Sequence, residues 1–240
     1  RPPRSTLDRS SAASDVYKRQ GFTIERVRFL RSPSLTEGFQ IIESYLTGLG
    51  RPLTSFCACE LRSPKPFDDK GFIEFNRLYV VSLEKWGIYS NDDNPVARSN
   101  VCPELNPPAE PQFHAFSYTI PNQKTNANSF IIAGAAEAEE GVGNYRERTI
   151  RVGETSPDAM REKAVDVLNT MEHRMSLLGV GWNQATATQV YTVFDIHSFL
   201  DDEIVSRGAS NYGLTWHYAR PPVYGLDYEM DTRGIQTELF

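Results

Sequence analysis

Two stretches of the chain, one in each half, carry apolar residues at helical spacing. In the first stretch the apolar positions are Leu35, Phe39, Ile42, Leu46 and Leu49. In the second stretch they are Ala164, Leu168, Met171, Met175 and Leu178. Steps of three and four residues place each set on one face of a helix, and that face packs against a core. The pattern therefore predicts one amphipathic helix in each half.

The two predicted helices share the same signals at their ends. Ser32–Pro33 opens the first and Ser156–Pro157 the second, since Ser suits the N-cap and Pro the first helical position. Ser34 also lies three residues before a glutamate, as in a capping box. Gly50 and Gly179 follow the last periodic positions, where a glycine commonly ends a helix. The repeated signals indicate an internal duplication.

The segments around these helices follow one order in both halves. Strands are predicted at residues 22–30, 55–61, 96–102 and 113–119, then at 129–134, 148–152, 185–193, 214–219 and 226–231. Further helices are predicted at residues 68–86 and 197–207. Each half thus reads β-β-α-β-α-β-β, with one N-terminal strand absent from the first half, as expected of a truncation. We predict an α+β fold in which two similar halves form a pseudo-dimer.

Composition divides the chain into four parts. Residues 1–20 are rich in Ser, Arg and Pro without helical or strand period, and they resemble translated sequencing-adapter read-through. We predict a non-native or disordered tail there. Residues 21–121 form the first half and residues 129–240 the second. The polar, asparagine-rich residues 122–128 are predicted to be the linker.

Charge and cysteine content narrow the choice of partners. The net charge is -6, and the arginines are scattered beyond the first twenty residues, which argues against a nucleic-acid partner. No apolar run approaches the roughly 20 residues that span a bilayer, and no secretory signal is visible. Cys57, Cys59 and Cys102 have no disulfide-framework spacing. We therefore predict free thiols in a reducing compartment, which places the chain in the cytoplasm.

Three short motifs resemble one known family. Residues 95–101 (PVARSNV) resemble its Pro-Ala-Arg-Ser-x-Val strand, residues 75–79 (FNRLY) its Phe-Asn-x-x-Tyr helix, and residues 131–134 (IIAG) its strand ending in Ser-Gly. The family is RidA/YjgF, the reactive-intermediate deaminases. The resemblance implies two tandem halves of the chorismate-mutase-like (RidA-type) fold. Residues 56–66, 95–118 and 213–231 are also similar to the duplicated deaminases of 2-aminomuconate-type acids from aromatic degradation.

The family resemblance implies a hydrolytic deaminase. Such an enzyme tautomerises a small enamine acid to an imine, adds water and releases ammonia, without a metal or an organic cofactor. Its partner would be a small carboxylate substrate, and the chain is expected to form a homo-oligomer, with a trimer favoured. The alternative is a non-catalytic module that binds or senses small carboxylates. Ribonuclease activity, a third possibility, is disfavoured by the acidic balance.

The resemblance places substrate binding at Arg98, the arginine of the Pro-Ala-Arg motif. A guanidinium matches a carboxylate with two hydrogen bonds and stays charged at any working pH; the alternative role is a salt bridge. Asn76 is a further substrate-binding candidate, or it fixes local hydrogen bonds. His217 and Arg220 could hold a second carboxylate of a diacid, or serve structure alone.

The acid/base group is sought where family members carry a glutamate early in the last strand. That position falls near His114 in the first half and near Asp227 or Glu229 in the second. We predict a composite site of Arg98 with Asp227 or Glu229. His114 is a second candidate, because an unperturbed imidazole titrates near neutral pH, or else a core histidine; Glu229 could instead lie on a solvated strand face. The second half lacks the Pro-Ala-Arg motif, so we expect one type of site per chain.

Overall fold

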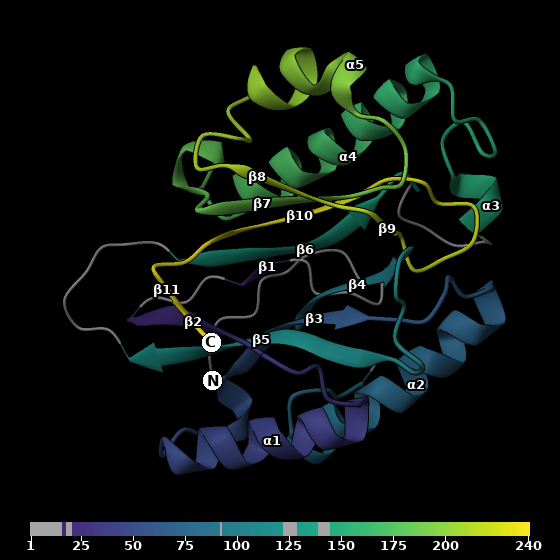
Figure 1. The fold of residues 1–240 in the computed structure, drawn as a ribbon. Coiled ribbons are helices and arrows are strands. Elements are labelled where there is room, and N and C mark those ends of the chain that lie inside the picture. The colour runs from purple at the N-terminus through teal and green to yellow at the C-terminus, as the bar shows by residue number, and fades with distance from the viewer. Residues whose placement is uncertain (1–15, 18–20, 92, 122–128, 139–144) are drawn as a thin grey trace.

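Four layers make up the fold, with two sheets stacked face to face and helices on both outer faces (Figure 1). The computed structural model describes residues 16–17, 21–91, 93–121, 129–138 and 145–240. One sheet has six strands in the order β11-β2-β5-β3-β4-β9, and the other has five in the order β1-β6-β10-β7-β8. The prediction of an α+β fold built from two halves is confirmed.

The first half supplies four central strands and two helices. These elements are β2 (Phe22–Arg28), α1 (Leu35–Gly48), β3 (Phe56–Arg62), α2 (Asp69–Lys85), β4 (Ala97–Pro103) and β5 (Gln112–Pro121), with a 3-10 turn at Leu53–Ser55. β5 pairs antiparallel with both β2 and β3, while β3 and β4 run parallel. Each observed element overlaps a predicted one.

The second half repeats this order with additions. Its elements are β6 (Phe130–Ala136), α3 (Tyr145–Arg148), α4 (Pro157–Leu177), a 3-10 turn at Trp182–Gln184, β7 (Ala187–Tyr191), α5 (His197–Phe199), a π-helix at Leu200–Val205, β8 (Leu214–His217) and β10 (Glu229–Gly234). β10 lies between β6 and β7, as β5 lies between β2 and β3. The predicted helix at 197–207 is thus two short pieces, one of them π-helical.

Short strands cross between the two sheets. β9 (Ala219–Arg220) leaves the second half to pair with β4, and β11 (Thr237–Leu239) runs parallel to β2. β1 (Val16–Tyr17) pairs with β6, so two residues of the predicted tail form a strand. The predicted linker at 122–128 lies outside the described residues. The two halves are therefore joined by shared sheets as well as by the chain.

The first helix starts later than its sequence predicts. The N-cap is Ser34, whose hydroxyl accepts from the backbone N–H of Glu37 at 3.3 Å, and not Ser32. The reason is that the carbonyl of Pro33 already accepts from the N–H of Phe113 on β5 at 2.9 Å. Leu49 was predicted on the inner face, but it is the C-cap and is 50% exposed. The second helix begins at Ser156 and Pro157 as predicted.

The strand predicted at 148–152 is absent from the described structure. Tyr145–Arg148 forms the short helix α3, and of the predicted strand only Thr149 makes a bridge, to Ala138. Arg151 and Gly153 adopt positive φ angles of 47° and 77°, which turn the chain before α4. A strand cannot continue through that turn.

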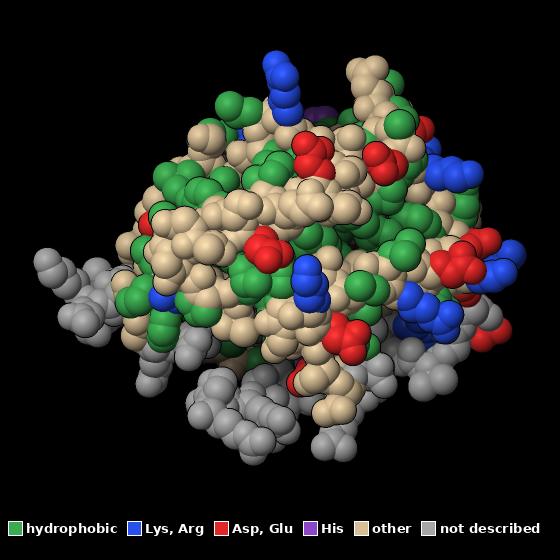
Figure 2. All heavy atoms as spheres, turned by 90° about the horizontal axis from the view of Figure 1, so that it is seen from below, with side chains coloured by type: hydrophobic (Ala, Val, Ile, Leu, Met, Phe, Trp, Pro, Cys, Tyr) green, Lys and Arg blue, Asp and Glu red, His purple; other side chains and the backbone are tan. Residues whose placement is uncertain are grey.

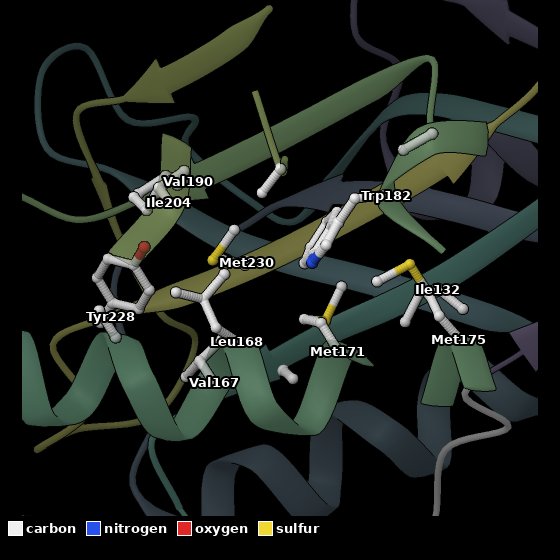
Figure 3. Packing of buried hydrophobic residues seen from close by; sticks show 14 of the residues in the cluster. Ile132, Val167, Leu168, Met171, Met175, Trp182, Val190, Ile204, Tyr228 and Met230 are labelled. Carbon is white, nitrogen blue, oxygen red and sulfur yellow. The ribbon is translucent and has the colours of Figure 1, made fainter. Parts of the chain in front are cut away.

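Each sheet packs a hydrophobic core against its own helices. Figure 3 shows the second-half core, in which Leu168 and Met171 of α4 meet Met230 of β10. The first-half core is aromatic, with Phe39 of α1 packing edge-to-face on Phe113 of β5 at 5.0 Å. The helices therefore cover the outer face of each sheet.

Charged residues and small apolar residues share the space between the sheets. Arg26 binds Glu60 at 2.6 Å and Glu238 at 3.1 Å. Arg233 binds Glu238 at 2.8 Å and lies 3.9 Å from Glu60, which closes a ring of alternating charges. Alanines fill part of the remaining space, among them Ala133. The sheets therefore meet through both a network of charged side chains and a small hydrophobic cluster.

The outer face of α1 and α2 mixes apolar and charged side chains (Figure 2). Ile73, Leu78 and Val81 of α2 are exposed there. The predicted homo-oligomer stays a prediction. None of the helices in the described segments combines the length and the hydropathy that crossing a bilayer demands.

Candidate functional site

Neutral side chains hold the guanidinium group of Arg98 in place, and no described carboxylate pairs with its charge. It lies on β4 and reaches over α2, where its guanidinium carbon sits 4.7 Å from the ring centroid of Tyr79 and 5.4 Å from that of Phe75. Its Nη2 donates to the side-chain oxygen of Asn76 at 2.7 Å. Aromatic faces and a neutral amide orient the group without an opposing charge. Among the described residues no carboxylate lies within ion-pair distance of it, so Arg98 can bind an external anion.

Glu229 comes to the same place from the other half. It is the first residue of β10 and is only 4% exposed. Gly134 of β6 makes room for it, because a Cβ there would lie 2.2 Å from Oε1 of Glu229 and 3.4 Å from Cα of Ser99. Since Ser99 follows Arg98 on β4, the carboxyl group fills the gap between β6 and β4. The structure thus places Glu229 close to the β4 backbone beside the residue that follows Arg98, and the charge of Arg98 acts on its pKa. The composite site itself stays a prediction.

Burial raises the pKa of Glu229 and so favours its protonated form. Desolvation raises its pKa well above the ordinary range, and the nearby carboxyls of Asp231 and Glu137 raise it further. Arg62 and Arg98 oppose this effect without cancelling it. Burial therefore favours the uncharged form of this carboxyl, and in that form it can donate a proton to a bound molecule.

A narrow pocket lies between the sheets beside these groups. β4 contributes Arg98 and Ser99 to its wall, and the second half contributes Ala133 of β6 and Asp231 of β10. Asp231 is held by Gln189 Nε2 at 2.7 Å and by the hydroxyl of Tyr191 at 2.9 Å. Both halves are needed to form this pocket.

Asp227 has a structural partner instead. The ammonium group of Lys163, which is fully buried, donates to Asp227 at 2.5 Å and lies 3.5 Å from Glu137. Glu137 in turn accepts from the backbone N–H groups of Asp227 and Tyr228 at 2.5 and 3.0 Å, and burial raises its pKa to about 7. Of the two acid/base candidates on this strand, the geometry favours Glu229.

Neither predicted histidine titrates near neutral pH. Burial and the positive charge of Arg62 lower the pKa of His114 to about 3 and that of His217 to about 4. His217 stacks on Tyr191 at 4.9 Å and its Nε2 lies 3.0 Å from the side-chain oxygen of Gln189. The argument for His114 from an unperturbed imidazole is therefore wrong, because burial disfavours the charged ring.

Arg220 is already neutralised. It makes two hydrogen bonds to Glu104, at 2.7 and 3.0 Å, where β9 pairs with β4. His217 is engaged elsewhere, so the structure does not make these two residues a joint carboxylate site. These contacts favour the structural alternative, and the carboxylate site stays a prediction.

Two nearby residues escaped the sequence analysis. Tyr145 of α3 packs on Phe72 at 6.0 Å, and both Arg98 and Glu229 act on the pKa of its hydroxyl, which burial raises. Nothing in its sequence context points to this position. Arg62 ends β3 and alternates with the partly buried Glu60, and charged residues at alternate positions of an otherwise apolar strand are a signal for a buried polar cluster.

Solved RidA-type proteins resemble parts of the chain. The YjgF gene product of E. coli matches at a TM-score of 0.33 and 13% identity, covering 47% of this chain and 84% of that protein. RidA from Psychrobacter sp. PAMC 21119 matches at a TM-score of 0.33 and 16% identity, covering 50% of this chain and 88% of its own.

Sequence relatives give a closer match. The 2-amino-5-chloromuconate deaminase of Comamonas testosteroni is 51% identical over 227 residues, which cover 94% of this chain and 90% of that protein. A family model described as 2-aminomuconate deaminase CnbZ matches residues 10–239. The similarity to 2-aminomuconate-type deaminases that the sequence predicts is confirmed. The chain belongs to the 2-aminomuconate deaminase CnbZ family.

Proposed function

We propose that this chain is a deaminase that hydrolyses a small enamine or imine carboxylic acid of the 2-aminomuconate type. The observation that carries the proposal is that the buried Glu229, whose pKa is raised, approaches the strand that bears Arg98, one residue coming from each half. The name of the relative from Comamonas testosteroni supplies the class of substrate.

The proposed reaction needs one anchored carboxylate and proton transfers at carbon, at water and at the leaving nitrogen. Arg98 binds the carboxylate next to the carbon that bears nitrogen. Glu229 protonates the enamine carbon adjacent to the nitrogen-bearing carbon, which converts the enamine to an iminium, and the resulting carboxylate then takes a proton from the water that attacks the nitrogen-bearing carbon. A proton passes from the hydroxyl group of the carbinolamine to its nitrogen, the C–N bond breaks, and ammonia leaves. One water is consumed, one ammonia and one 2-oxo acid are formed, and no oxidant or reductant enters.

The two residues are expected to affect different kinetic constants. Because Glu229 acts in the proton transfers, Glu229→Gln should lower kcat by about 10²- to 10⁴-fold with little change in KM. Because Arg98 binds the carboxylate in substrate and transition state alike, Arg98→Ala should mainly raise KM. Ammonia release from 2-aminomuconate measures both, with the exposed Glu154→Gln as a control that keeps wild-type kinetics.

A second candidate function is binding without turnover. It is favoured by the first half, where His114 stands at the family's glutamate position and its lowered pKa leaves it without a proton to exchange at neutral pH. Wild-type protein that binds 2-aminomuconate but releases no ammonia above background would support this candidate. Equal ammonia release by wild type and Glu229→Gln would contradict the proposed role of Glu229.

A further inference from the structure

Glu137 buries a carboxylate at the end of β6, on the side of the sheet that faces away from the pocket. It directly follows β6 and is fully buried. Side chains alternate along a strand, and Ala136 is the ladder partner of Glu229, so Glu137 and Glu229 lie on opposite faces of the five-stranded sheet. Lys163 of α4, the helix that covers the outer face, lies 3.5 Å from the carboxylate (Figure 1). Glu137 therefore does not contact a molecule bound between the sheets.

The carboxylate of Glu137 instead binds the backbone that leads into β10. It accepts from the N–H of Asp227 at 2.5 Å and from the N–H of Tyr228 at 3.0 Å. These two residues directly precede Glu229, and the ladders of β10 with β6 and with β7 both begin at Glu229. The side chain of Glu137 thus takes the place of a strand partner for the two N–H groups.

Three side chains bind the two residues that precede Glu229. The ammonium group of Lys163 donates to the side chain of Asp227, and the hydroxyl of Thr192 donates to the carbonyl of Asp227 at 2.7 Å. Both of these contacts reach Asp227 alone. Of the three side chains, only Glu137 bonds both residues, so it has the strongest hold on the direction in which the chain enters β10.

The gap that receives the side chain of Glu229 leaves little room for displacement. A Cβ at Gly134 would lie 2.2 Å from Oε1 of Glu229 and 3.4 Å from Cα of Ser99. A shift of the backbone at the start of β10 moves the whole side chain of Glu229, because this residue is the first of the strand. The hydrogen bonds at residues 227–228 therefore determine where the carboxyl group enters the gap.

We propose that Glu137 is a positioning residue, whose charged carboxylate fixes the start of β10 and thereby the place of the Glu229 carboxyl group beside β4. The inference rests on the proposed function for the catalytic role of Glu229, and on the two N–H bonds for the role of Glu137. Glu137 acts through the backbone of β10 and touches no substrate.

Glu137 changes its charge near neutral pH. Burial raises its pKa to about 7, while the N–H groups of Asp227 and Tyr228 and the charge of Lys163 oppose the rise. Among the described residues, the charged and titratable groups that face it are Lys163 of α4, Asp227 before β10, and Tyr228 and Glu229, whose pKa values it raises. A protonated carboxyl uses one oxygen as a hydroxyl donor and so accepts less well. Below about pH 7, one of the two N–H bonds is therefore weakened.

Glu137→Gln reproduces the uncharged form at every pH and tests the inference in kinetics. We expect kcat for ammonia release from 2-aminomuconate to fall by about 10- to 100-fold with little change in KM, because a hydrogen bond to a charged group is lost. In wild type, kcat should rise as the pH passes 7, and this rise should be absent in Glu137→Gln.

Two matched variants separate this role from a loss of stability. Thr192→Val removes the bond to the carbonyl of Asp227 and loosens the same segment, but it keeps the ionisable group, so the rise near pH 7 should stay. Glu162→Gln makes the same chemical change on the surface of α4 and should keep wild-type kinetics.

A second measurement needs no activity. The amide proton resonances of Asp227 and Tyr228, followed by NMR spectroscopy, should titrate together near pH 7 in wild type, and this titration should vanish in Glu137→Gln. Resonances that stay unchanged across this range would overturn the inference, and so would wild-type kcat and pH dependence in Glu137→Gln. If the glutamine variant does not fold, the wild-type titration still decides.

Failure of the proposed function would look different. Amide protons that titrate as expected, in a wild-type protein that releases no ammonia from 2-aminomuconate, would support the hydrogen-bonding role of Glu137 and contradict the deaminase. Conversely, ammonia release with the same kcat and pH dependence in wild type and Glu137→Gln would support the deaminase and overturn the role of Glu137.

Discussion

Gly134 offers a way to displace Glu229 without changing its chemistry. A methyl group at position 134 would lie 2.2 Å from Oε1 of Glu229, whereas ordinary contacts begin near 3.4 Å. The φ angle of Gly134 is not positive, so alanine fits the backbone. The carboxyl oxygen, at the end of a flexible side chain, must retreat by at least about 1 Å, and a displacement of this size in a catalytic group costs on the order of 10²-fold in rate.

Gly134→Ala should therefore lose activity more than stability. Overpacking a core costs about 1–3 kcal/mol, and the mobile end of Glu229 makes the lower end of that range the expectation. Cδ of Glu229, at 3.1 Å, moves with the carboxyl group, and Cα of Ser99, at 3.4 Å, needs little adjustment. The measurements are kcat/KM for ammonia release and the urea midpoint of unfolding. Gly48→Ala is the matched control, because nothing lies within 4 Å of its new methyl group.

A double-mutant cycle asks whether the effect passes through Glu229. In a Glu229→Gln background the acid/base contribution is already lost, so adding Gly134→Ala should cost little further activity. Wild-type kcat/KM in Gly134→Ala, or a full additional 10²-fold loss in the Gln background, would refute the reasoning that this glycine serves the carboxyl group.

Three further changes probe other parts of the site. Asn76→Ala removes the hydrogen bond that orients Arg98 and should lower kcat/KM by about tenfold, since hydrogen bonds to charged groups contribute ~1.5–3 kcal/mol; unaltered kinetics would argue against this orienting role. Lys163→Met leaves the carboxylate of Asp227 without its partner and should lower the free energy of unfolding by about 3–5 kcal/mol, measured in urea. The pKa of His217 is lowered to about 4 in the folded protein. As the pH falls, the same histidine in the unfolded chain therefore takes up its proton at a higher pH. That residue's contribution to stability is complete above pH 6.5 and is lost as the pH falls toward 4, and His217→Gln should flatten this part of the pH–stability curve.

Local patterns were sufficient to predict most of the fold. Helix α4 keeps its predicted start at Pro157, because the cap, the proline and the apolar face all act within one helix. The start of α1 was misplaced because a contact with β5, far along the chain, holds Pro33. In the turn before α4, Arg151 adopts a positive φ angle although it is not a glycine, and only Gly153, two residues later, is an ordinary turn signal. Where a distant contact or an unusual backbone angle determines the bounds of an element, the local sequence pattern does not predict them.

In the candidate site, too, local signals were predicted from the sequence and distant contacts were not. Arg98 was identified by a motif within one strand. Asp227 and Glu229 are two residues apart, so strand alternation assigns them to one face and does not separate them. What separates them is Lys163, which lies 64 residues earlier and pairs with Asp227 at 2.5 Å. The histidines were misjudged for a similar reason, since burial and the charge of Arg62 come from other strands.

The exchange of β9 and β11 between the sheets has a thermodynamic consequence. A tandem duplication whose halves closed separately could melt in two steps, the weaker half first. Here the second half cannot unravel without removing β11 from β2 and β9 from β4, which exposes two edges of the other sheet. Denaturation should therefore be a single cooperative transition, and neither half expressed alone should be soluble. The two similar halves therefore form one folding unit, and a destabilising mutation in either half should lower the free energy of unfolding of the whole chain.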